Sequence, residues 1–331
     1  MSNRTQPACH SCGYAGEAYL DALPALDLSV SLGLHEESWN GRLRKERRKH
    51  MAPKAVITGG TRGIGVEVAI ELAQRGYAIT VVGRDEEHGE QAVRRIGDAR
   101  FIQADLSVLA EVRALGARLA EEGPLQVLVN NVGGMWSTRW ETADGIEASF
   151  ALNHLSPTVL TEALLDALRT GRPSRVVDVT SSSISVALMS GTPVYQEIEH
   201  DEYYGMAASG RAKLAHLAYN QDLAQRLRDS GVSVFAADPG PSATPNAAEM
   251  TPQILPPALR PHWEQIRLGV QRPAADGARP VVFAATDPSL SDQTGLVIGD
   301  DCTTTNALTT ALTPELITAV DALTERVLKR N

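Results

Sequence analysis

The sequence predicts a doubly wound α/β domain built on a parallel sheet of about seven strands. Two observations lead to this prediction. After Met51, short apolar segments alternate with helical segments, and the apolar segments are hydrophobic throughout, as strands buried on both faces of a sheet are. Residues 54–65 (KAVITGGTRGIG) also run from a strand through a glycine-rich turn into a helix. That order places backbone N–H groups at a helix start, where they can bind phosphate.

The remaining elements follow this first strand, turn and helix in regular alternation. Strands are expected at Tyr77–Val82, Arg100–Ala104, Gln126–Asn130, Arg175–Thr180 and Val232–Ala237, with a last one near Gly295–Ile298. Helices are expected at Glu86–Ile96, Val108–Glu121, Gly145–Arg169 and Ala207–Ser230. Helical crossovers of this length require parallel pairing of the strands that they join. The sequence therefore predicts a Rossmann-type sheet with a nucleotide lying across its carboxyl edge.

The chain is expected to hold one domain, residues 51–331, behind an N-terminal extension of residues 1–50 that is not part of the core. The extension has an apolar stretch followed by a basic run, which is the reverse of the order in a secretory signal. Proline and glycine cluster in residues 239–261, a composition that does not suit a core element. We expect a loop-rich lid over the substrate at about 241–270.

Composition and charge exclude several classes of protein. The chain has 331 residues, is 43% hydrophobic and carries a net charge of −9, which suits one large core and argues against a nucleic-acid surface. No run of eighteen apolar residues is present, so no membrane span is expected. Three cysteines are too few and too scattered for a disulfide framework, which fits the cytoplasm. Cys9 and Cys12 have no second pair to complete a zinc site, so no metal is expected.

The end of the second predicted strand bears on the choice of nucleotide. An acidic residue there would hydrogen-bond a ribose 2′-hydroxyl, whereas an arginine suits a 2′-phosphate. The chain has Arg84 at this place, and Arg62 within the glycine turn adds a second cation. Together they favour NADP(H) over NAD(H).

Polar residues and glycines continue along the chain at the ends of the predicted strands and in the long helices. They are Asp105-Leu106, Asn130-Asn131-Val132-Gly133, Asn153, Ser181, Lys213, and Pro239-Gly240 with Thr244. With the glycine turn, this order of motifs resembles the short-chain dehydrogenase/reductase superfamily over residues 53 to about 300. Residues 152–155 and 213–216 look most like its retinol-dehydrogenase-like branch.

The resemblance implies a role for each matching position. Cofactor contacts are implied for Gly59, Thr61, Arg62, Gly63, Ile64 and Gly65 at the pyrophosphate side, Asp105 and Leu106 beside the adenine, Asn131, Val132 and Gly133 along the ribose, and Pro239, Gly240 and Thr244 at the nicotinamide end. Asn153 is implied to hold a water of the proton relay. Ser181 is implied to hydrogen-bond the substrate oxygen, and Lys213 to bind the nicotinamide ribose.

One position departs from the family pattern. The family has a tyrosine four residues before the lysine, and this chain has Ser209. A phenol beside a lysine ammonium is a usable acid or base, whereas a serine hydroxyl is far less acidic and ends about a ring's length short. Ser209 is therefore a candidate catalytic position with altered chemistry. Either a water carries the proton, or another residue reaches in, or the site does no carbonyl chemistry.

Other candidates for a proton donor lie in the segment before Lys213. Three are tyrosines: Tyr195, Tyr203 and Tyr204. Three more are the acid–base residues His200, Asp201 and Glu202, although a charged run of this kind is also typical of a solvated loop. Tyr204 lies five residues before Ser209, where a packing role is the simpler interpretation. His154 and His216 have apolar helical neighbours and are interpreted as packing residues rather than catalysts.

The preferred hypothesis is an NADP(H)-dependent oxidoreductase that acts on a carbonyl or an activated C=C or C=N bond of a small, fairly apolar molecule. The alternative is a non-redox enzyme on the same scaffold (a cyclase, dehydratase or isomerase with NADP bound structurally) or a catalytically silent NADP(H)-binding protein. The expected partners are a small-molecule substrate and, by resemblance, further copies of the chain. A homodimer or homotetramer would associate through the helices predicted at 145–169 and 207–230.

Overall fold

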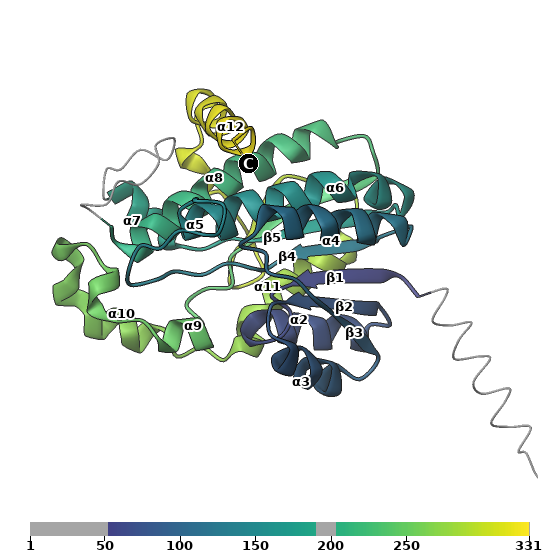
Figure 1. The fold of residues 1–331 in the computed structure, drawn as a ribbon, viewed down its shortest axis with the longest axis horizontal. Helices are drawn as coiled ribbons and strands as arrows, with labels where there is room; N and C mark the ends of the chain where they lie inside the picture. The colour runs from purple at the N-terminus through teal and green to yellow at the C-terminus, as the bar shows by residue number, and fades with distance from the viewer. Residues whose placement is uncertain (1–51, 190–202, 331) are drawn as a thin grey trace, which may run out of the picture. The chain divides into compact units, whose positions relative to one another are not determined.

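The structure is a computed structural model that describes residues 52–189 and 203–330. Within these residues one sheet has eight strands in the order β3-β2-β1-β4-β5-β6-β7-β8 (Figure 1). The strands are β1 (Lys54–Thr58), β2 (Ala78–Gly83), β3 (Ala99–Gln103), β4 (Val127–Asn130), β5 (Ser174–Val179), β6 (Val232–Ala237), β7 (Leu296–Ile298) and β8 (Thr304–Thr305). The first seven are parallel, and β8 pairs antiparallel with β7. The predicted parallel α/β sheet is therefore confirmed, with one short strand added at its edge.

The order of the strands reverses between β1 and β4. From β1 the chain passes outward through β2 to β3 and then returns to β4 on the other side of β1. Ile57 is in register with Val129, so Thr58 and Asn130 end their strands at the same level. In sheets of this kind, ligands bind at the carboxyl ends of the two strands where the order reverses. The sheet order thus points to the edge formed by the residues that follow β1 and β4.

Helices cover both faces of the sheet (Figure 1). One face is covered by α2 (Gly63–Gln74), α3 (Glu86–Ile96) and α11 (Ala274–Thr286), the other by α4 (Leu109–Glu121), α6 (Ser156–Thr170) and α8 (Gly205–Arg226). Leu72 of α2 and Val281 of α11 are buried in the same hydrophobic cluster as Phe235 of β6 on the first face. Leu164 and Leu223 are buried on the second. Each such side chain contributes about 1.5–3 kcal/mol by leaving water, and these two layers hold the strand ends in place.

The helix predicted at Gly145–Arg169 is interrupted. It consists of α5 (Ala148–Phe150), a π-helical turn η1 (Ala151–Leu155) and α6. Pro157, in the first turn of α6, has no N–H to donate to the carbonyl of Asn153 four residues earlier, so the backbone widens there. Single π-turns of this kind are frequent at functional sites. The expected uninterrupted helix was wrong, and Asn153 lies in the middle of the wider turn.

Several elements were not predicted. Helix α7 (Ser183–Met189) begins shortly after β5, with residues 180–182 between them. The segment predicted as a lid, residues 241–270, contains short helices: α9 (Pro245–Ala248), η3 (Pro252–Ile254), η4 (Pro257–His262) and α10 (Trp263–Gly269). The turns η5 (Pro288–Leu290) and η6 (Thr309–Ala311) lie on either side of β7 and β8. Among the described helices, none is long and apolar enough to cross a membrane.

A C-terminal helix, α12 (Pro314–Leu328), was also missed. Its Val320 packs beside Leu214 of α8, and its Leu323 packs beside Leu155 of η1. The Nε2 atom of His154 lies 2.6 Å from the hydroxyl of Thr324. Helix α12 therefore packs on part of α8, and association of copies through α8 stays a prediction.

Candidate active site

The glycine turn after β1 leaves the start of α2 open to an anion. Gly63 has φ of 56°, a left-handed conformation that suits glycine. A Cβ atom at Gly65 would lie 2.3 Å from the carbonyl oxygen of Gly59, so no other residue fits there. Arg62 is the N-cap of α2, and no side chain caps the first turn. The first N–H groups of the helix therefore lack side-chain acceptors, which fits a pyrophosphate.

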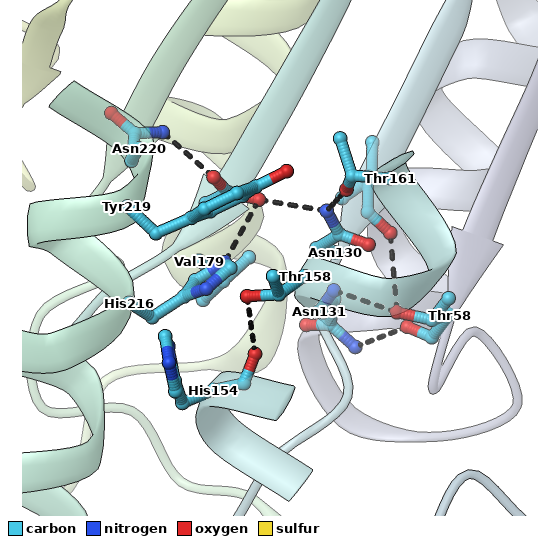
Figure 2. A network of polar contacts seen from close by, with 12 residues as sticks. Thr58, Asn130, Asn131, His154, Thr158, Thr161, Val179, His216, Tyr219 and Asn220 are labelled. Atoms are coloured by element: carbon cyan, nitrogen blue, oxygen red, sulfur yellow. Dashed lines mark hydrogen bonds and ion pairs between the residues drawn. The ribbon is translucent and has the colours of Figure 1, made fainter. Parts of the chain in front are cut away.

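The turn is fastened to the end of β4 (Figure 2). The hydroxyl of Thr58 accepts hydrogen bonds from the N–H groups of Asn131 (3.0 Å) and Val132 (3.1 Å). The Asn131 amide donates to the carbonyls of Thr58 (3.0 Å) and Gly59 (3.1 Å). The Nδ2 of Asn131, predicted to line the cofactor's ribose, is thus used to hold the turn in shape.

The two arginines predicted to bind a 2′-phosphate lie at neighbouring strand and helix ends. Arg84 follows β2 and is exposed, as is Arg62. Asp85, which follows Arg84, caps α3 by accepting from the His88 N–H at 2.8 Å. That hydrogen bond holds the pKa of Asp85 below its usual value, and the charge of Arg62 contributes. Sequence reasoning missed this acidic neighbour. Thr61 packs on Gly83, where a Cβ atom would lie 2.8 Å from the threonine methyl.

After β3, Asp105 and Leu106 lie at the same edge of the sheet with different surroundings. The Asp105 carboxylate accepts from the N–H (2.9 Å) and hydroxyl (2.8 Å) of Ser107. The Leu106 side chain is buried in the core. Any contact of Leu106 with an adenine would therefore come from its backbone.

Asn153 and Lys213 meet beside Gly133. A Cβ atom at Gly133 would lie 2.2 Å from Asn153 Oδ1 and 3.3 Å from Lys213 Nζ. Asn153 Oδ1 accepts from the Gly134 N–H (3.1 Å), and its Nδ2 donates to the Gly134 carbonyl (2.9 Å). Lys213 Nζ donates to the carbonyl of Val179 at the end of β5 (2.6 Å). Three elements that are distant in sequence thus bring two of the predicted catalytic residues together.

The protonation of Lys213 is shifted toward neutral pH. Burial lowers the pKa of its ammonium to about 8, although the charges of Asp178 and Asp238 act in the opposite direction. Loss of charge from a buried ammonium removes the cost of desolvating it. Lys213 can therefore change its protonation state within the pH range in which enzymes work.

Ser181 lies shortly after β5, and Ser209 lies on α8. Thr180 separates Ser181 from the end of β5, and the Ser181 hydroxyl accepts from the Ser183 N–H (3.1 Å) at the start of α7. Ser209 is 3% exposed and lies one helical turn before Lys213. A Cβ atom at Gly210 would lie 2.1 Å from the Ser183 carbonyl, so α8 passes directly against α7 here. Among the described residues, no hydrogen bond of the Ser209 side chain is present.

The tyrosines suggested as substitute donors have other contacts. Tyr203 OH donates to Glu147 Oε1 (3.4 Å) and lies 3.3 Å from the Ser149 hydroxyl. Burial and the charge of Glu147 raise the pKa of Tyr203, which makes its phenol a weaker acid. The Tyr204 ring lies 5.9 Å from the guanidinium of Arg260. Tyr195, His200, Asp201 and Glu202 lie outside the described residues.

The structure contains a buried polar network around β5 that the sequence did not reveal (Figure 2). Asp178 of β5 accepts from Asn130 (2.8 Å) and Asn220 (2.7 Å), and His216 Nε2 lies 3.2 Å from its Oδ1. Burial alone would raise the pKa of Asp178, but the charge of His216 and these hydrogen bonds hold it below its usual value. Burial also keeps the pKa of His154 well below its usual value. Both histidines are buried, as the packing interpretation expected, but they belong to a polar network.

The Pro239-Gly240 turn is held on the other side of the edge. Arg272 donates to the carboxylate of Asp300 (2.9 Å) and to its carbonyl (2.8 Å), and it reaches the Pro239 carbonyl at 3.4 Å. Thr244 caps α9 by accepting from the Ala247 N–H (3.2 Å). A Cβ atom at Gly63 would lie 3.5 Å from the Thr244 methyl, so this segment faces the glycine turn. Ile64 lies beside Gly277 of α11 on the same side.

Comparisons with known proteins agree with this arrangement. The family model "short chain dehydrogenase" matches residues 53–254. Retinol dehydrogenase 12 of Bos taurus is 34% identical over 239 residues, which span 68% of this chain and 74% of that protein. Retinol dehydrogenase 12 of Mus musculus is 39% identical over 193 residues, 56% of this chain and 60% of that protein. The alignments thus leave parts of both relatives uncovered.

Solved structures resemble the fold. The Pseudomonas aeruginosa RhlG/NADP active-site complex has a TM-score of 0.58 at 27% identity, over 75% of this chain and 94% of that chain. A short chain dehydrogenase from Burkholderia cenocepacia in complex with NADP has a TM-score of 0.58 at 25% identity, over 75% of this chain and 95% of that chain. The family model covers more than half of the chain, and the fold and the order of motifs agree with it. This chain therefore belongs to the short chain dehydrogenase family of oxidoreductases.

Proposed function

We propose that the protein is an NADP(H)-dependent oxidoreductase that acts on a carbonyl or an activated C=C or C=N bond of a small, fairly apolar molecule. The observation that carries the proposal is the meeting of Asn153 and Lys213 at Gly133, beside the glycine turn of β1. A hydride donor lying across this edge would have its reactive end at these two residues. Membership of a dehydrogenase family favours redox chemistry over the non-redox alternative.

The cofactor would be held by the backbone more than by side chains. When bound, NADPH supplies the hydride. The uncapped start of α2 accommodates the pyrophosphate, and Arg62 and Arg84 offer charge-assisted hydrogen bonds to a 2′-phosphate. Lys213, which is held at the end of β5, would bind the nicotinamide ribose. Complexes of two similar proteins with NADP support this choice.

Proton handling would differ from that of a site with a phenol. Ser181 can hydrogen-bond a substrate oxygen at the end of β5, and Asn153 holds the loop opposite. Ser209 is too short and too weakly acidic to donate a proton directly. We infer that a water beside Ser209 passes the proton and that the Lys213 ammonium restores it.

The choice of an apolar substrate is supported by two aromatic side chains in the loop after β4. Trp136 and Trp140 follow Gly133 and pack edge to face with ring centroids 5.5 Å apart. Both are half-buried. Retinol dehydrogenases among the relatives also bear the name of an apolar substrate.

The proposal is tested by mixing the protein with NADPH and a panel of aldehydes, ketones and α,β-unsaturated carbonyl compounds and following the absorbance of the reduced nicotinamide. Turnover above the background rate supports it. Product formation without consumption of NADPH would favour the non-redox alternative. Tight binding of NADPH with neither product formation nor NADPH consumption would favour a catalytically silent protein.

Replacing Arg84 with alanine is expected to weaken NADPH binding by about ten- to a hundredfold and to leave NADH binding within about twofold, because one charge-assisted contact to the 2′-phosphate is lost. Isothermal titration calorimetry with both nucleotides measures the effect. Arg94→Ala, which removes an exposed arginine from α3, is the matched control. Equal dissociation constants for NADPH and NADH in the unmodified protein would contradict the assignment.

The rate of reduction is expected to fall as pH rises through about 8. The pKa of Lys213 is lowered to about 8, so its charged form, which both binds the cofactor and supplies the proton, is lost above that pH. Lys213→Arg keeps the charge throughout and should remove this limb of the profile, at a lower rate at every pH because a guanidinium does not give up its proton. A profile of kcat against pH that shows the same limb in both proteins would assign it to another group.

A further inference from the structure

The loop after β4 is held from two sides by asparagine carboxamides. Asn246 of α9 accepts from the Met135 N–H (3.2 Å) and donates to the Met135 carbonyl (3.1 Å). Asn153 of η1 makes the same pair of hydrogen bonds with the preceding residue, Gly134. Gly134 and Met135, two consecutive residues of one loop, are therefore each hydrogen-bonded through both the N–H and the carbonyl by an asparagine side chain.

The chemistry of the carboxamide explains why asparagine stands at both places. An amide side chain offers one acceptor and two donor hydrogens, so it can satisfy a backbone N–H and a carbonyl of one residue together. A carboxylate of the same size can accept but not donate. Leucine, with a similar shape, can do neither. Asn246 thus forms a specific bridge across 111 residues of sequence.

Further contacts place α9 between the two loops of the site. Thr244, at the start of α9, faces Gly63 of the glycine turn. The hydroxyls of Ser137 and Thr251 lie 3.3 Å apart, which joins the lid to the same loop a second time. The lid segment, residues 241–270, is therefore joined to the loop after β4 at Asn246 and at Thr251.

We propose that Asn246 is a positioning residue that couples the lid to Asn153. Because Met135 and Gly134 are consecutive, any movement of α9 that displaces Met135 also displaces Gly134, and with it the Asn153 side chain. A seated lid then fixes the orientation of Asn153, and a raised lid releases it. Only the catalytic consequence of this coupling rests on the proposed function.

Hydrogen exchange of individual backbone amides in the free protein tests the coupling. In Asn246→Ala, the Met135 amide loses its acceptor and should exchange about tenfold faster or more. The decisive amide is that of Gly134, which Asn246 does not touch and which should also exchange several-fold faster. Asn246→Asp, which still accepts from Met135, should give a smaller acceleration at both amides. Unchanged exchange at Gly134 while Met135 accelerates would overturn the coupling.

A matched control and a kinetic measurement complete the test. Asn306→Ala makes the same chemical change at an exposed asparagine in the segment after β8 and should leave both amides unchanged. With a substrate in hand, Asn246→Ala should lower kcat by about tenfold or more while the dissociation constant of NADPH changes less than about threefold. In the Asn153→Ala background, adding Asn246→Ala should have little further effect on kcat. Additive losses would overturn the proposal, and the exchange result stands even if no substrate is reduced.

Discussion

Replacing Ser209 with tyrosine is expected to raise the rate of NADPH-dependent reduction of a small ketone by about 10²-fold or more. A positioned proton donor typically contributes about 10²–10⁴-fold to a rate. Ser209 lies one helical turn before Lys213, so a ring at this position extends along the same face of α8 toward the ends of β5 and β6. The charged Lys213 would lower the pKa of the new phenol and make it a usable acid.

Ser209→Phe is the matched control because it adds the same ring without a hydroxyl group. The rate of ketone reduction should be about 10²-fold or more higher in the tyrosine variant than in the phenylalanine variant. The absorbance of the reduced nicotinamide at saturating NADPH measures both rates. For the native substrate we expect a lower rate in both variants, since the ring fills space that the substrate or a water uses. Equal rates of ketone reduction in both variants, with normal NADPH binding, would place residue 209 outside the active site.

Replacing Gly133 with alanine is expected to lower the rate of reduction by about 10²-fold without unfolding the protein. The new methyl would lie 2.2 Å from Asn153 Oδ1 and 3.3 Å from Lys213 Nζ, so both side chains must move. A displacement of about 1 Å at a catalytic group can cost about 10²-fold. Steady-state kinetics and a thermal melt measure the two parts of this prediction.

Gly269→Ala serves as the control for this change. Gly269, at the end of α10, has an ordinary backbone conformation and no atom within 4 Å of an added Cβ. The activity and melting temperature of the Gly269→Ala variant should stay close to those of the unmodified protein. Full activity in Gly133→Ala would mean that neither Asn153 nor Lys213 contributes to the reaction at this point.

Features with local causes could be predicted from the sequence. Helix α3 begins and ends at the predicted residues because Asp85 caps its start and Gly97 ends it. Strand β6 also has its predicted bounds, since an apolar run lies between Gly231 and Pro239. The glycine turn was found for the same reason, as four glycines within seven residues directly follow a strand.

Two missed features had local signals that were available. Pro157 lies inside the predicted helix 145–169 and indicates the break that the structure has there. Thr313 followed by Pro314 is typical of a helix start, and Thr313 does cap α12 by accepting from the Leu316 N–H. The long helical pattern over 145–169 outweighed the first signal, and the second lies beyond the last element that was predicted.

The remainder could not be predicted because its causes join distant parts of the chain. The Asn131 amide holds carbonyls 72 and 73 residues away, and Asp178 meets Asn220 across 42 residues. Nothing in the neighbourhood of Asp178 distinguishes it from an exposed carboxylate at a strand end. The hydrogen bonds between Asn246 and Met135 likewise join two segments that are distant in sequence, so the sequence alone does not predict them.

The packing of α12 on η1 has a consequence for the order in which the protein is made. Synthesis proceeds from the N-terminus, so strands β1 to β6 leave the ribosome before residues 314–328 exist. Until then, the apolar side chains around Leu155 and the imidazole of His154 have no cover from Leu323 and Thr324. The turn that carries Asn153 therefore receives its last support at the end of translation, so the nascent chain can form the strands and the glycine turn after β1 well before η1 is fully packed.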